Sequence, residues 1–138
     1  MKSLHILFAL FVLTAIGAAT GAPVVVTNPN VATETVDAES IKSMFRGKKL
    51  AWGNKSPVVV AVLKEGAVHE EFLKKAFNIS PGSFSNYWRL TAMSGGATAP
   101  KEFSSEEDLL KFVAATPGAI GYVDSSKVTD SVHVVTVP

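Results

Sequence analysis

Two kinds of segment alternate along most of the chain, one with strand-like and one with helix-like spacing of its hydrophobic residues. The strand-like runs, with Gly, Pro or Asn near their ends, lie at residues 24–27, 58–63, 119–123 and 132–137. The run at 58–63 is almost continuously apolar, which is typical of a strand covered on both faces. We predict four strands, and His133 within the last run and Pro138 directly after it indicate that 132–137 lies at an edge.

Four further segments have helical spacing and recognisable starts. Their starts are Asp37 as a cap, Ala67 after a glycine, Ser80-Pro81 as cap and first position, and Ser104 with Glu107 at capping-box spacing. Strands interleaved with helices predict an α/β fold in which a small mixed sheet is flanked by helices.

The large aromatic residues fall into two groups. Phe84 and Trp88 share the inner face of the helix predicted from residue 80, and we interpret them as core. Trp52 lies in a loop at 48–57 that contains Gly and Asn, where either burial or a place at an interface fits the sequence.

The start of the chain follows a different pattern. After an initial lysine, an apolar run at 6–19 carries no charged residue, and small residues follow it. This predicts a secretory signal peptide, cleaved after Gly21 or alternatively after Ala19. The run is shorter than the ~20 residues of a membrane-spanning helix, although an uncleaved anchor is the other interpretation. We therefore expect a signal peptide at 1–21 and a single exported, periplasmic domain at 22–138, without stable membrane insertion after cleavage.

Charge and cysteine content exclude several functional classes. The 138-residue chain has 13 Lys and Arg against 12 Asp and Glu, and no cysteine. With this charge balance the chain lacks the excess of Lys and Arg that is typical of nucleic-acid-binding proteins. Without cysteine, disulfides and thiol catalysis are excluded. His69 and His133 lack metal-ligand spacing, and no Gly-x-Ser-x-Gly turn is present. We predict a protein that is not an enzyme and uses no metal or cofactor.

The connection between the second predicted strand and the following helix is the candidate binding site. Backbone N–H groups at a helix N-terminus are unpaired and can hold an anion. A glycine permits close approach of a ligand, and a lysine supplies positive charge. We predict a ligand-binding site formed by Lys64, Gly66, Ala67, Val68 and His69, with a plain connection as the alternative.

Several segments carry a resemblance to a known family. They are the stretch Ile41 to Lys48 followed by Trp52, Glu70-Glu71-Phe72, Tyr87-Trp88, and the stretch Thr116 to Val123. Through these segments the mature chain resembles one lobe of the phosphate-type periplasmic substrate-binding proteins of bacterial ABC transporters. The resemblance implies an exported lobe of the type II periplasmic binding fold, with a small anion such as phosphate as its ligand.

The candidate turn departs from the family pattern. An Arg-x-x-x-Ser-Gly-Thr turn supplies much of the phosphate contact in the family, whereas this chain has Leu63 at the Arg place and Ala67-Val68-His69 for Ser-Gly-Thr. Charge-assisted hydrogen bonds are the strong ones in such a site. We therefore expect weak anion binding by backbone N–H groups, with Lys64 or His69 as the charge.

The length of the chain departs from the family as well. A clamshell needs two lobes, and the mature chain matches one, so we expect a companion lobe, a permease or self-association. The alternative function is a periplasmic protein-interaction module that has kept the fold and lost ligand binding, because an open concave face would favour a partner.

Overall fold

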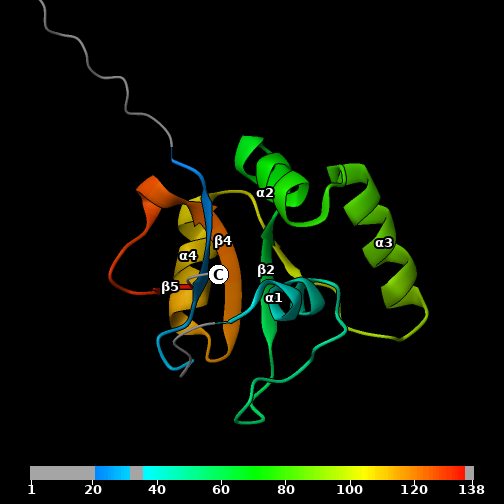
Figure 1. The fold of residues 1–138 in the computed structure, drawn as a ribbon, viewed down its shortest axis with the longest axis horizontal. Helices are drawn as coiled ribbons and strands as arrows, with labels where there is room; N and C mark the ends of the chain where they lie inside the picture. The colour runs from blue at the N-terminus through cyan, green and yellow to red at the C-terminus, as the bar shows by residue number, and fades with distance from the viewer. Residues whose placement is uncertain (1–20, 32–35, 136–138) are drawn as a thin grey trace, which may run out of the picture.

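In the computed structural model, which describes residues 21–31 and 36–135, five strands form one open mixed sheet (Figure 1). In the spatial order β3-β2-β4-β1-β5, they are β1 (Pro23–Thr27), β2 (Val59–Leu63), β3 (Lys101–Phe103), β4 (Ala119–Asp124) and β5 (His133–Val135). β2 runs parallel to β3 and β4, whereas β1 is antiparallel to β4 and β5. The predicted α/β architecture with a small mixed sheet is confirmed, and β5 lies at an edge as predicted.

The sequence analysis did not predict β3. Its three residues are too few to show an alternating pattern, and Lys101 and Glu102 are exposed. The strand forms because its backbone pairs with Ala61 to Leu63 of β2, a partner distant in sequence.

Four α-helices lie within the described residues: α1 (Ala38–Phe45), α2 (Ala67–Phe77), α3 (Pro81–Met93) and α4 (Glu106–Ala115). A short 3-10 helix, η3 (Ser125–Lys127), follows β4. The predicted caps of α1 and α3 are confirmed, since the side chains of Asp37 and Ser80 accept hydrogen bonds from the Ser40 and Ser83 N–H groups.

The predicted start of α4 is wrong by one residue. Ser105, not Ser104, is the cap, and its hydroxyl accepts from the Asp108 N–H at 3.1 Å. Each serine has an acidic residue three positions later, Glu107 or Asp108, so the sequence pattern did not separate them.

The helices cover both faces of the sheet. Gly121 of β4 faces α4, because a Cβ atom there would lie 2.9 Å from Leu109 Cδ2. Tyr122 points to the opposite face, as alternation along a strand requires, and its ring stacks on Phe72 of α2 with centroids 4.0 Å apart. On that same face, the centroid of the Phe45 ring of α1 lies 6.0 Å from the centroid of the Tyr122 ring. α3 lies beyond the β2 side of the sheet (Figure 1).

Both tryptophans are buried. Trp88 and Phe84 belong to the core as predicted, and Trp88 Nε1 donates to the Phe45 carbonyl at 3.0 Å. Of the two interpretations of Trp52 the structure supports burial, with Nε1 donating to the Gly118 carbonyl at 2.9 Å. Gly118 has a φ of 83° and would bring a Cβ atom 2.2 Å from the Pro57 carbonyl oxygen, so this loop contact requires glycine.

The predicted signal peptide falls outside the described residues, except for Gly21. Over the part of the chain that the structure does describe, none of the helices has the length and apolar character to span a bilayer.

Candidate functional site

The candidate turn lies where parallel strands end and helices begin. β2, β3 and β4 are parallel, so their carboxyl ends share one edge of the sheet, and α2 and α4 start shortly after β2 and β3. Open α/β sheets bind ligands outside the carboxyl ends of their strands. Gly66 makes the turn into α2 with a φ of 108°, a conformation that other residues rarely adopt.

An open hollow of about 450 Å³ occupies this edge, and we call it the strand-end hollow. Its lining residues come from the end of β2, the two helix starts and η3: Leu63, Glu65, Gly66, Ala67, Val68, Ser104, Ser105, Glu106, Glu107 and Lys127. Three of the five predicted site residues therefore lie together in it.

The start of α2 leaves backbone donors without side-chain partners. Gly66 occupies the cap position and makes no side-chain capping bond, whereas Asp37, Ser80 and Ser105 cap the other three described α-helices. The N–H groups of the first turn have no partner within the helix itself. They are thus available to an anion in the hollow.

Charged side chains of both signs surround these donors. Lys127 on η3 supplies a cation that the sequence analysis missed, because its position depends on the pairing of β4 with β2. Glu65, Glu106 and Glu107 supply carboxylates, of which Glu106 accepts a hydrogen bond from the Asp124 N–H at 2.6 Å. These carboxylates repel an anionic ligand and therefore oppose its tight binding.

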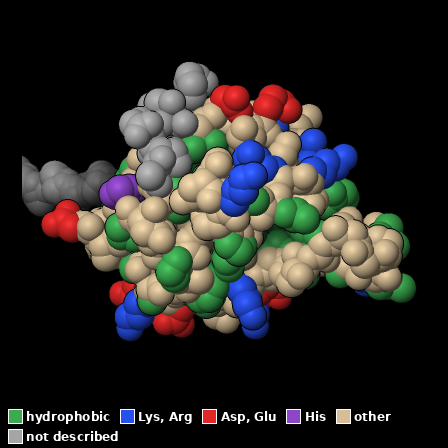
Figure 2. Space-filling view, turned by 90° about the horizontal axis from the view of Figure 1, so that it is seen from below, with side chains coloured by type: hydrophobic (Ala, Val, Ile, Leu, Met, Phe, Trp, Pro, Cys, Tyr) green, Lys and Arg blue, Asp and Glu red, His purple; other side chains and the backbone are tan. Residues whose placement is uncertain are grey.

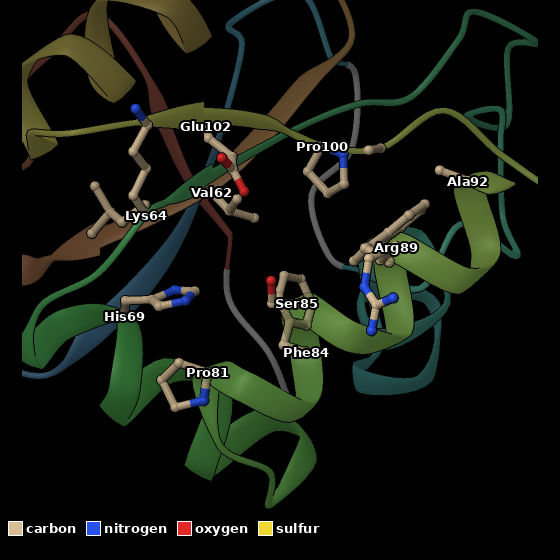
Figure 3. Close-up of a pocket in the computed structure, with 13 residues that line it drawn as sticks. Val62, Lys64, His69, Pro81, Phe84, Ser85, Arg89, Ala92, Pro100 and Glu102 are labelled. Atoms are coloured by element: carbon tan, nitrogen blue, oxygen red, sulfur yellow. The ribbon is translucent and has the colours of Figure 1, made fainter.

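The side chains of the other two predicted residues, Lys64 and His69, line a different cavity. This α2–α3 cavity has a volume of about 260 Å³ and lies between the ends of β2 and β3 and the α2 and α3 helices (Figure 3). His69 is buried, with 4% of its surface exposed, and Lys64 is exposed at the rim. The structure therefore divides the predicted site residues between two places.

Hydrogen bonds hold His69 against the sheet. Its Nδ1 lies 2.5 Å from the Tyr122 hydroxyl, which also accepts from the Leu63 N–H at 3.0 Å. Burial lowers the pKa of His69, against the opposing charges of Glu102 and Glu70, so the ring is neutral near pH 7. The sequence analysis predicted Lys64 or His69 as the charge of the site, and the neutral His69 ring leaves Lys64 as the cation of that pair.

The described residues hold no group of three or more His, Asp or Glu side chains placed to bind a metal ion. Charged side chains of both signs are spread over the molecular surface, with hydrophobic side chains between them, on the face drawn in Figure 2.

The fold is similar to solved structures of longer binding proteins. A protein assigned as a phosphate ABC transporter substrate-binding protein from Clostridium perfringens, solved with bound phosphate, shares 21% identity at a TM-score of 0.68, over 86% of this chain and 46% of that one. An ABC-type phosphate transport receptor from Vibrio cholerae has 13% identity and a TM-score of 0.64, over 86% of this chain and 47% of that one. PstS from Borrelia burgdorferi has 12% identity and a TM-score of 0.61, over 86% of this chain and 48% of that one. Comparison with protein-family models and with curated protein sequences gives no match.

These similarities confirm, at the level of the fold, the resemblance to one lobe of a phosphate-type substrate-binding protein. The chain spans about half the length of each of these structures. Their names describe binding proteins and a transport receptor rather than enzymes.

Proposed function

We propose that this protein is an exported, non-enzymatic binding lobe that holds a small phosphate-like anion weakly in the strand-end hollow. The observation that carries the proposal is the uncapped start of α2 at the carboxyl ends of the parallel strands. Solved phosphate-binding proteins share this fold. The donors are the backbone N–H groups of Ala67, Val68 and His69, and Gly66 permits the anion to approach them. Lys127 supplies the positive charge of the hollow, whereas the side chain of Lys64 lines the α2–α3 cavity.

The composition of the hollow sets the strength of this binding. Neutral backbone hydrogen bonds contribute roughly 1 kcal/mol each, and exposed lysines add little because water and salt screen them. The carboxylates of Glu65 and Glu107 oppose the ligand's charge. Three such hydrogen bonds and a screened cation give about 4 kcal/mol, which corresponds to a Kd of about 1 mM.

Calorimetric titration of the purified protein with phosphate tests this function. We expect Lys127→Ala to weaken phosphate binding a few-fold, whereas Lys111→Ala, which removes an exposed lysine of α4 that does not line the hollow, leaves it unchanged. Absence of binding heat at phosphate concentrations well above the millimolar range contradicts the proposal.

Export is tested separately, because the proposal places the mature start at Ala22. N-terminal sequencing of the protein recovered from the periplasm of an expressing bacterium is expected to give Ala22, or Thr20 for the alternative cleavage site. Recovery of the chain with Met1 intact in the membrane or the cytoplasm contradicts cleavage and export.

A protein-interaction module is the second candidate function, and the outer face of α3 favours it. Leu90 and Met93 lie three residues apart, on one side of the helix, and are 55% and 75% exposed. A companion lobe, a permease or a second copy would cover such side chains. Light scattering of the protein and of the Met93→Glu variant tests self-association. A dimer that the variant converts to a monomer indicates self-association through this face. A monomer in both cases shows that the protein does not pair with a second copy.

A further inference from the structure

The floor of the α2–α3 cavity is apolar except for one buried imidazole. Its buried lining residues are Val62, Leu63, Phe84, Trp88 and His69. The indole N–H of Trp88 is already bonded to the Phe45 carbonyl, so His69 is the polar group that the floor presents. Figure 3 shows the His69 ring of α2 and the Ser85 side chain of α3 extending toward the same space.

The contacts of Tyr122 determine which nitrogen of His69 carries the proton. The hydroxyl oxygen accepts from the Leu63 N–H at 3.0 Å, and its own proton has His69 Nδ1, at 2.5 Å, as the acceptor within reach among the described residues. A neutral imidazole that accepts at Nδ1 carries its proton at Nε2. Burial raises the pKa of Tyr122 and lowers that of His69, so both groups keep these forms at pH 7.

The Nε2–H group of His69 is therefore a donor in need of an acceptor. Within residues 21–31 and 36–135, the side chain of His69 has one hydrogen bond, between Nδ1 and the Tyr122 hydroxyl, and none at Nε2. Buried donors in native proteins are almost always paired, with protein, water or ligand. The 4% exposure of His69 leaves the α2–α3 cavity as the place from which an acceptor reaches it.

The rim of the cavity indicates the charge of that acceptor. Lys64 and Arg89 contribute two cations and Glu102 one anion, and all three side chains are exposed. The volume of about 260 Å³ is just below the roughly 300–1,000 Å³ of pockets for drug-sized ligands. A short ligand with an anionic acceptor at one end and an apolar body fits these features.

We infer that the α2–α3 cavity is a second binding site, which takes a small organic carboxylate with a short apolar body. One carboxylate oxygen accepts from His69 Nε2–H, Lys64 and Arg89 attract the charge, and the body packs on Phe84 and Trp88. Glu102 pairs with an ammonium group where the carboxylate is an amino acid. This site is separate from the strand-end hollow and does not depend on phosphate binding there.

Nitrogen-15 NMR of the His69 imidazole tests the inference on the intact protein. In the free protein we expect Nε2 protonated and Nδ1 unprotonated. Isocaproate is expected to shift the Nε2 resonance in a saturable way, leucine to do so at least as strongly, and isoamylamine, which lacks the carboxylate, to leave it unchanged. A proton on Nδ1 in the free protein, or no shift with either isocaproate or leucine, overturns the proposal.

Two variants connect the shift to the cavity. His69→Phe keeps the bulk of the ring but removes the donor, and we expect isocaproate to bind tenfold to a hundredfold more weakly. Arg89→Gln, on an exposed helix surface, provides a second variant that does not disturb the core, with Lys111→Gln as its matched control. Arg89 does not line the strand-end hollow, so phosphate binding there is expected to persist in Arg89→Gln and the two proposals fail separately. Isocaproate affinity that is unchanged in Arg89→Gln and in a folded His69→Phe overturns the assignment.

Discussion

At the scale of single residues, Tyr122 joins three elements through one side chain. Its hydroxyl accepts from Leu63 at the end of β2 and bonds to His69 of α2, while its ring stacks on Phe72. The side chain is fully buried, so water does not readily replace these partners. Tyr122 thus fixes both the strand end that leads into the candidate turn and the orientation of His69.

Removal of this hydroxyl is expected to be costly. Tyr122→Phe leaves the Leu63 N–H and His69 Nδ1 unpaired in the core, and we expect a loss of about 2 kcal/mol in the free energy of unfolding, measured by urea denaturation. Tyr87→Phe is the control, because the Tyr87 hydroxyl bonds to the Arg46 carbonyl in an exposed position. Equal and small losses in both variants would contradict the role given to Tyr122.

His69 makes the stability depend on pH. Burial lowers the folded-state pKa of His69 below the ordinary value of 6.5. Between these two pKa values the unfolded chain therefore binds a proton that the folded protein does not bind. The free energy of unfolding should therefore be fully present above about pH 6.5 and fall as the pH drops toward the folded-state pKa, by at most ~1.4 kcal/mol per pH unit. Urea denaturation across this range should show a flatter profile for His69→Gln. An identical profile in the two proteins would show that His69 is not responsible.

At the scale of elements, the two helix starts at the hollow differ in how their backbone donors are satisfied. α4 has the Ser105 hydroxyl on the Asp108 N–H, whereas α2 begins at a glycine without a side-chain cap. An uncapped start lowers the stability of a helix, so a bound anion would stabilise α2 by replacing the missing cap.

The start of α4 gives a matched pair of variants. Ser105→Ala removes the cap and is expected to cost about 1 kcal/mol of unfolding free energy, while Ser104→Ala should change it by only a few tenths. Thermal or urea denaturation of the two variants decides between the adjacent serines. A larger loss in Ser104→Ala would favour the start that the sequence pattern first indicated.

Helices and long strands were predictable because each carries its own signal. Asp37 and Ser80 mark helix starts through local hydrogen bonding, and the apolar run of β2 reflects burial on both faces. β3 has no such local signal, since its existence depends on pairing with β2. The choice between Ser104 and Ser105 likewise depends on how α4 packs.

At the scale of the whole molecule, one connection between β2 and α2 serves two separate spaces. The backbone of Gly66 to Val68 opens into the strand-end hollow, and the side chains of Lys64 and His69 line the α2–α3 cavity. Sequence order placed these residues together, but a helix directs neighbouring side chains to different faces. Lys127 of η3 lines the hollow, Glu102 of β3 lines the cavity, and Tyr122 of β4 bonds to His69. All three come from distant parts of the sequence, so the sequence analysis had no means to include them.

The most direct test of the central claim is an NMR titration of backbone amides with phosphate. We expect the amide resonances of Ala67, Val68 and His69 to shift together and to saturate in the millimolar range, with smaller changes at Lys127. Unchanged resonances at the start of α2, or shifts confined to other surfaces, would contradict anion binding at the strand-end hollow and leave the interaction module as the better account of this fold.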